Sequence, residues 1–247
     1  MLEFALQYGG RGWRVFPVHS TVSGACSCGK DCGKQAGKHP RIREWQKLAT
    51  TDREQIEKWW RRWPQANIGI ATGGGLVVTD LDGPAEIARF QALAAGRLPE
   101  TLVVATARGL HIYFEGDWPT TKKVDGLLVR GTGGFVIAPP SFHASGIRYS
   151  WANNTTLAPM PDWFRDWLQT VDNPTITGQD GTTLLSHAPA YLQATKPKQD
   201  QRSVLNRAKA ALGPQQTPHE VQRIASALRA ISADCERDAW LHIGRDC

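Results

Sequence analysis

The spacing of apolar residues along the chain predicts several helices. In residues 51–63 apolar side chains recur at helical spacing, Thr51 and Glu54 form a capping-box pair, and Pro64 follows as a stop. We therefore expect a helix that begins at Thr51 and ends before Pro64. Helical spacing also predicts a short helix near the N-terminus and helices over residues 84–96 and 161–170.

Short apolar runs bounded by Gly, Pro and polar residues predict strands between these helices. We expect strands over residues 13–18, 67–72, 76–81, 102–106, 110–115, 127–130 and 135–138. Helices alternate too sparsely with these strands for a doubly wound parallel sheet. The pattern therefore predicts an α+β fold with a mixed, largely antiparallel sheet.

The periodic pattern also suggests how the chain is divided. Residues 171–201 are rich in Thr, Gly, Asp, Pro, Gln and Lys and have few periodic apolar positions, which is typical of a linker. We expect a first domain over residues 1–170, this linker, and a small helical region over residues 202–247. That last region is short for a core and ends without a clear cap, so we expect it to be truncated from a longer protein.

The composition is that of a globular protein with a substantial core. Of its 247 residues, 41% are hydrophobic. No apolar run reaches the roughly 20 residues of a membrane span, and the N-terminus lacks a secretory signal, so we expect a soluble, cytoplasmic protein with no membrane partner. The net charge of +6 favours polyanionic partners, because each Lys or Arg that meets a phosphate releases a counterion.

An aperiodic loop over residues 19–40 carries a set of metal-binding side chains. Cys26, Cys28, Cys32 and His39 lie among several glycines, and four such ligands suit one tetrahedral Zn²⁺. A cytosolic setting and the single residue between Cys26 and Cys28 argue against disulfides. All four protein positions would be filled, so the zinc would be structural. His19 is an alternative to one of the four ligands.

Two carboxylates stand at the end of an apolar strand. Asp80 and Asp82 are two positions apart, so both point from one face of the strand while Leu81 points away. Hard cations such as Mg²⁺ or Mn²⁺ prefer carboxylate oxygens, and a cation would offset the repulsion between the two charges. The pair predicts a divalent metal site. A helix N-cap before Pro84 is the alternative role for Asp82.

The following strands carry a histidine and side chains that suit phosphates. His111 and Tyr113 share one face of their strand, although a single histidine on a strand more often has a structural role. Thr106 and Arg108 precede it, and a hydroxyl with a guanidinium can hold a triphosphate. The Gly-rich segment 131–134 permits either close approach to a ligand or an ordinary hairpin turn.

Five segments of the chain occur together in a recognisable order. They are GWRVFPV, CSCGKDCGKQAGKHP, VTDLDG, TARGLHIYF and VRGTGGFVIAPPSFHASG. Together they resemble the bifunctional DNA primase/polymerase N-terminal family of the archaeo-eukaryotic primase superfamily, over about residues 1–165. The resemblance implies a primase-polymerase fold and a nucleotidyltransferase that uses Mg²⁺ or Mn²⁺.

The resemblance also implies partners and a setting. The expected substrates are a single-stranded DNA template with dNTPs or NTPs, and the expected activity is the synthesis and extension of primers. Such domains serve phage or plasmid replication in a bacterial or phage-infected cell. A helicase domain often follows them, which agrees with the expected truncation.

Roles for single residues follow from the same resemblance. It implies metal ligands at Asp80 and Asp82. It implies contacts to the phosphates of the incoming nucleotide from His111, Thr106, Arg108, Arg130 and His143.

One position departs from the family's acidic pattern. The family commonly has a third carboxylate in the strand before the Gly-rich turn, and Leu128 stands there in this chain. Asp125 could replace it only after a register shift, and its odd offset would put it on the opposite face. The alternative to a polymerase is therefore a weakly active or inert module that binds single-stranded DNA.

Overall fold

The computed structural model describes residues 1–22 and 24–172. The chain divides into two compact units. Among the described residues, the first comprises Met1–Phe90 and Pro99–Pro161, and the second comprises Gln91–Leu98 and residues 162–172. Apart from residues 171 and 172, the predicted linker and the predicted helical region over residues 202–247 lie outside the described residues.

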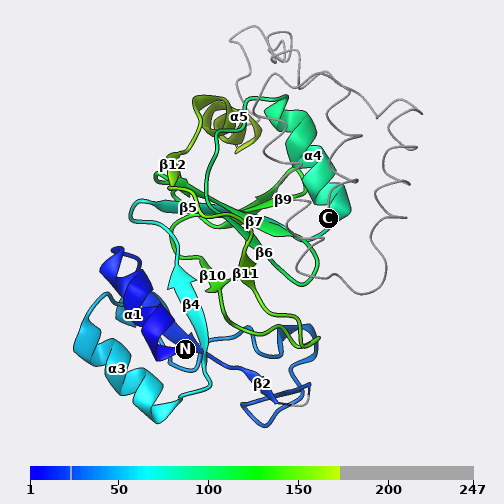
Figure 1. Cartoon of the computed structure of the whole chain (residues 1–247). Coiled ribbons are helices and arrows are strands. Elements are labelled where there is room, and N and C mark those ends of the chain that lie inside the picture. The colour runs from blue at the N-terminus through cyan, green and yellow to red at the C-terminus, as the bar shows by residue number, and fades with distance from the viewer. Residues whose placement is uncertain (23, 173–247) are drawn as a thin grey trace, which may run out of the picture. The chain divides into compact units, whose positions relative to one another are not determined.

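A small antiparallel sheet in the first unit carries the N-terminal part of the core. Its strands follow the order β1-β4-β10 and comprise Val15–Val18, Asn67–Ala71 and Phe135–Ala138. Helices α1 (Leu2–Gly10) and α3 (Arg53–Arg62) pack against each other beside it (Figure 1). The ring of Phe16 lies so close to Gly69 on the neighbouring strand that a side chain there would collide with it.

A larger sheet in the same unit carries the candidate site. Its strand order is β11-β6-β7-β5-β9-β8. In addition, β12 pairs with the C-terminal end of β7, at Phe114 and Glu115, beyond the part of β7 that pairs with β6. All neighbours are antiparallel except β12 and β7. The strands are β5 (Leu76–Leu81), β6 (Val103–Ala105), β7 (Leu110–Glu115), β8 (Lys122–Val124), β9 (Leu127–Arg130), β11 (Ser150–Trp151) and β12 (Ala158–Pro159). The predicted α+β class with largely antiparallel sheets is confirmed.

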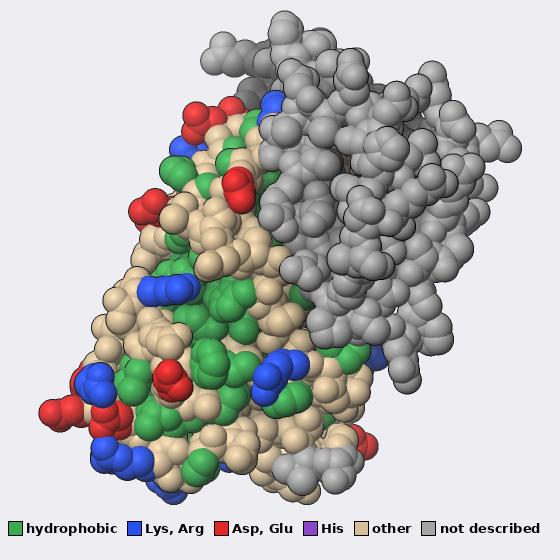
Figure 2. Space-filling model, in the orientation of Figure 1, with side chains coloured by type: hydrophobic (Ala, Val, Ile, Leu, Met, Phe, Trp, Pro, Cys, Tyr) green, Lys and Arg blue, Asp and Glu red, His purple; other side chains and the backbone are tan. Residues whose placement is uncertain are grey.

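Several shorter elements complete the described chain. They are β2 (Thr21–Val22), β3 (Ala25–Cys26), η1 (Gly33–Gln35), α2 (Trp45–Leu48), α4 (Pro84–Ala94) and α5 (Asp162–Asp172). Among the described helices, none has the length and hydropathy that crossing a membrane requires. On the described part of the face in Figure 2, acidic and basic side chains are interspersed with apolar ones.

Two local expectations need correction. Helix α3 is capped by Asp52, whose carboxylate accepts a hydrogen bond from the backbone of Glu54, so Thr51 is not the N-cap. The Gly-rich segment after β9 is not a hairpin turn, because β9 and β10 belong to different sheets. Added side chains at Gly131 and Gly134 would collide with Trp118, Thr120 and Thr121, so glycine lets the chain cross tightly between the sheets.

Candidate active site and metal centre

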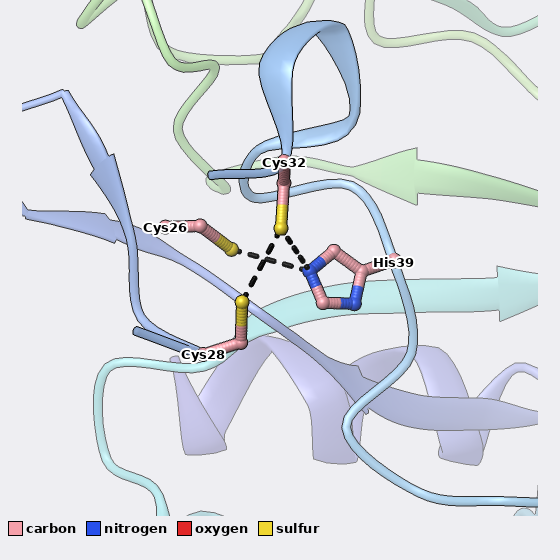
Figure 3. Close-up of side chains that lie close together, drawn as sticks. All are labelled: Cys26, Cys28, Cys32 and His39. Carbon is pink, nitrogen blue, oxygen red and sulfur yellow. Dashed lines mark hydrogen bonds between the residues drawn. The ribbon is translucent and has the colours of Figure 1, made fainter. Parts of the chain in front are cut away.

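The three cysteines and the histidine of the loop converge on one point (Figure 3). Cys26 Sγ lies 3.2 Å from His39 Nε2, Cys32 Sγ lies 3.4 Å from the same nitrogen, and Cys28 Sγ lies 3.3 Å from Cys32 Sγ. The four ligand atoms all lie within 4.8 Å of one another, and the cysteines form no disulfide. Thiolates and an imidazole in this compact arrangement are the ligands of structural zinc sites, so the group could hold zinc.

Local hydrogen bonds suit this metal-binding role. The backbone N–H of Lys30 donates to Cys28 Sγ, and this bond lowers the pKa of the Cys28 thiol toward the thiolate that zinc binds. His19 is not one of the four converging side chains. Its Nδ1 lies 3.0 Å from Ser27 Oγ, and its ring lies 4.4 Å from that of His39. His19 therefore lies beside the candidate ligand His39 and is not a member of the four-residue group.

A row of side chains crosses the larger sheet at the predicted acidic position. Asp80 on β5 is directly opposite His111 on β7 and directly opposite Leu128 on β9. Residues directly opposite in antiparallel strands share a face of the sheet. The alternating positions Thr79 and Leu81 are fully buried on the other face. The sheet thus brings Asp80, His111 and Leu128 together, as the sequence pattern predicts for the first two.

Asp80 is a largely buried carboxylate held by two partners. Its side chain is 15% exposed, Arg130 Nη2 donates to it over 2.9 Å, and His111 Nε2 lies 3.5 Å away. Burial raises the pKa of Asp80, but His111, in its protonated form, and the charged Arg130 outweigh burial and hold the pKa below its ordinary value. Asp80 is therefore an anion at neutral pH.

His111 is buried at the centre of the row. Burial lowers its pKa and the charge of Asp80 opposes that effect only in part, so its imidazole is neutral near pH 7. The rings of Tyr113 and Tyr149 lie 6.5 Å and 6.0 Å from it. Within the described residues, His111 Nδ1 and Arg130 Nε are buried without a hydrogen-bond partner. Such groups are costly, and in native proteins they call for a functional explanation.

The second carboxylate, Asp82, follows the end of β5. Its two oxygens accept hydrogen bonds of 2.8 and 2.6 Å from Arg108 Nη2, and both side chains are more than half exposed. The first hydrogen bond of α4 is accepted by the Gly83 carbonyl. The Asp82 carboxylate therefore faces Arg108 and does not serve as the predicted alternative, an N-cap of α4.

The turn between β6 and β7 places Arg108 beside Asp82. Thr106 Oγ1 accepts hydrogen bonds from the backbone of Arg108 and of Gly109, at 3.3 and 3.0 Å. Gly109 presses against the carbonyl of Leu81, where a side chain would collide with backbone. The threonine therefore shapes the turn, and the glycine lets the turn approach the end of β5.

His143 lies within electrostatic range of this group. It follows β10, and its Nδ1 accepts a hydrogen bond from the backbone of Ser145. Burial lowers the pKa of His143 most, the charges of Lys38 and Arg108 lower it further, and the charge of Asp82 raises it. His143 therefore feels the charge of Asp82, and its contact with the phosphates of a nucleotide stays a prediction.

Lys38 is a site residue that the sequence reasoning missed. It belongs to the cysteine loop, yet its charge lowers the pKa of Asp80, His111 and His143. Burial lowers the pKa of Lys38 itself, with Arg108 acting in the same direction and the two carboxylates opposing. No periodicity marks this lysine. The one sequence signal is its place directly before the candidate ligand His39.

Asp125 does not take the third acidic position. It lies with Gly126 in the tight turn between β8 and β9, and both residues have positive φ, of 45° and 88°. This is a two-residue hairpin turn of the kind that Asp-Gly favours. The Asp125 carboxylate pairs with Arg89 of α4. Leu128 therefore remains the residue opposite Asp80.

Comparison with known proteins points to one family. A family model described as bifunctional DNA primase/polymerase, N-terminal, matches residues 5–163. A search of curated proteins finds no match to the chain.

Proposed function

Because the chain belongs to the bifunctional DNA primase/polymerase N-terminal family, whose substrates are DNA and nucleotides, we propose that it synthesises and extends primers on single-stranded DNA. The setting that we propose is phage or plasmid replication, with a helicase domain as a partner in the full-length protein. The reaction is nucleotidyl transfer, in which the 3′-hydroxyl of the growing strand attacks the α-phosphorus of a nucleoside triphosphate and pyrophosphate leaves.

The observation that supports this proposal is the balance of charge around Asp80 and Asp82. Two carboxylates, Asp80 and Asp82, lie among three cations, Lys38, Arg108 and Arg130. Each arginine already donates a hydrogen bond to one of the two carboxylates. The additional positive charge favours an anionic ligand, and a triphosphate bound with divalent cations fits a mixed set of carboxylates and cations.

The two carboxylates suit Mg²⁺ or Mn²⁺ by donor chemistry. Asp80 is a buried anion, and both residues offer the hard oxygen ligands that these ions prefer. Divalent ions bound there would activate the 3′-hydroxyl and neutralise charge on the triphosphate. In this proposal Asp80 and Asp82 are the metal ligands, and the protein's main contribution is to position the reacting groups.

The remaining side chains act on the phosphates. The guanidinium groups of Arg108 and Arg130 can exchange a carboxylate for phosphate oxygens, because their donor geometry fits both. His111, neutral and buried, offers a hydrogen bond without adding a charge. Thr106 holds the turn that presents Arg108, and His143 is a further contact at the edge of the group.

Leu128 favours a second candidate function. It puts an apolar side chain directly opposite Asp80, where the family pattern has a carboxylate. A site with one ligand fewer holds cations less firmly. The second candidate is therefore a domain of the same fold that binds single-stranded DNA without efficient catalysis.

One experiment separates the two candidates. The purified chain is incubated with single-stranded templates, with and without a primer, with labelled dNTPs or NTPs and with Mg²⁺ or Mn²⁺. Labelled products support the polymerase, and products without a primer show that it also starts strands. Template binding without any product would contradict the polymerase and favour the binding module.

A further inference from the structure

The cysteine loop is tied to the candidate site by a single buried side chain. Asn67, at the start of β4, donates hydrogen bonds of 2.9 Å to the carbonyls of Gly37 and Phe142 and accepts one of 3.0 Å from the backbone of Phe142. Gly37 directly precedes Lys38, and Phe142 directly precedes His143. One amide therefore fixes the backbone beside both Lys38 and His143.

The backbone on the other side of Lys38 is fixed as well. His19 donates its backbone N–H to the carbonyl of His39, and Arg41 donates to the carbonyl of Pro17, at 2.9 and 3.0 Å. Gly37 has a φ of 71°, and a side chain there would press on Thr21. The loop is thus anchored before and after Lys38, and its direction is set by contacts that do not involve the Lys38 side chain.

Among the described residues, this placement gives Lys38 no dedicated carboxylate partner. Asp80 is already paired with Arg130, and Asp82 is already paired with Arg108. The hydrogen bonds of Asn67 nevertheless bring the backbone beside Lys38 toward His111, because Tyr149 donates its backbone N–H to the carbonyl of Ser141, the neighbour of Phe142, and the Tyr149 ring lies 6.0 Å from that of His111. A half-buried lysine without a carboxylate partner is unfavourable unless an anion binds there.

We propose that Lys38 binds the triphosphate of the incoming nucleotide, and that the metal-binding loop of Cys26, Cys28, Cys32 and His39 holds Lys38 in the nucleotide site. This inference rests on the proposed function. His39 is both a candidate zinc ligand and the immediate neighbour of Lys38. Loss of the metal would remove one of the constraints on this loop, at the residue next to the lysine, so we expect zinc and nucleotide affinity to be coupled.

The test compares Lys38→Ala with Lys34→Ala, which removes the same charge from an exposed position in the same loop. Binding of a dNTP and of the matching dNMP is measured by calorimetry in Ca²⁺ buffer, so that no turnover is needed. We expect Lys38→Ala to weaken dNTP binding by at least about tenfold, the effect of losing one hydrogen bond to a charged group. Binding of the dNMP should change much less, and Lys34→Ala should bind both ligands like the wild type.

The second part of the test concerns the metal and uses Cys32→Ser, alone and combined with Lys38→Ala. We expect Cys32→Ser to lose bound zinc and to weaken dNTP binding, and the second substitution to add little, since both act through one side chain. If Cys32→Ser does not fold, the wild type is stripped of zinc with a chelator, dialysed and measured in the same way. Unchanged dNTP binding without zinc would overturn the coupling.

The outcomes separate this inference from the proposed function. Wild-type binding of dNTPs together with equal binding by Lys38→Ala would overturn the role of Lys38 and leave the polymerase proposal standing. Failure of the wild type to bind any dNTP would contradict both. Weakened binding in Lys38→Ala alone supports the inference.

Discussion

Leu128 is the residue whose surroundings bear most directly on catalysis. It lies directly opposite Asp80, and Arg130 follows two positions later on the same face of β9. A carboxylate at this position would therefore share the site with Asp80 and meet a nearby guanidinium, which would lessen the cost of its charge.

We predict that Leu128→Asp strengthens the metal site. A third carboxylate should tighten Mn²⁺ binding by about tenfold and speed primer extension, because hard cations gain an anionic oxygen ligand. Mn²⁺ affinity is measured by electron paramagnetic resonance. Leu128→Asn is the matched control, with nearly the same shape and no charge. Equal Mn²⁺ affinity in the two variants would refute the idea.

The raised pKa of the buried Tyr8 hydroxyl makes the stability of the fold depend on pH in the alkaline range. Its hydroxyl donates a 2.7 Å hydrogen bond to the carbonyl of Pro139, and burial raises its pKa from 10.0 to about 12. The unfolded chain loses this proton near pH 10 and the folded chain only near pH 12, so stability is intact below pH 10 and falls as pH rises through this window.

We predict that Tyr8→Phe flattens this alkaline loss of stability. The free energy of unfolding is measured by urea titration at several pH values between 10 and 12. The wild type should lose roughly 3 kcal/mol through Tyr8 across the window. Burial also raises the pKa of Tyr113 and Tyr149, so part of the loss should remain in the variant. An unchanged slope in Tyr8→Phe would show that Tyr8 ionises freely in the folded protein.

Residue-level prediction from sequence succeeds where a pattern fixes a side chain's direction. Alternation along β5 puts Asp80 on a chosen face, and the register then brings His111 opposite. Lys38 escapes such reasoning because it lies in an irregular loop, where no periodicity sets direction. Long-range hydrogen bonds of Asn67 on β4 and of Pro17 on β1 hold that loop in place, and the sequence does not reveal them.

At the scale of elements, length decides what the sequence can predict. The longer strands and helices α1, α3, α4 and α5 appear near the expected positions because several apolar residues repeat in each. The short elements β2, β3, β8, β11, β12 and α2 have two to four residues each, too few for a periodic signal, and they were not predicted. The passage of the chain from β9 to a different sheet was also missed, because an apolar run does not specify its partner.

The β6–β7 turn gives a test at this scale. In Gly109→Ala the added methyl group would meet the Leu81 carbonyl, so the turn must move and carry Arg108 away from Asp82. We expect a loss of roughly 1–3 kcal/mol in the free energy of unfolding, as for other overpacked sites, together with weaker dNTP binding. Thermal and chemical unfolding measure the first, and calorimetry measures the second.

Gly10→Ala provides the control for that substitution. Gly10 ends α1, and an added methyl group there meets nothing within 4 Å. Stability and dNTP binding should both be retained. A Gly109→Ala protein that matches this control in both measurements would show that the turn tolerates displacement.

For the whole molecule, the sequence predicts the class of fold and the family better than the activity. The family model covers residues 5–163, and both sheets that build the site lie within that range. The net charge of +6 is not gathered into one basic patch on the described part of the face in Figure 2. The cationic excess around Asp80 and Asp82 is therefore a local property of the fold, which only the assembled strands and loop could reveal.

The central claim is that the acidic pair performs nucleotidyl transfer, and primer extension by Asp80→Asn tests it most directly. The amide keeps the shape of the side chain and removes its charge. Glu100→Gln makes the same chemical change at an exposed position and serves as the control. We predict a loss of at least about a hundredfold in the extension rate of Asp80→Asn, with template binding retained, and no loss in the control. Extension at the wild-type rate by Asp80→Asn would contradict the account.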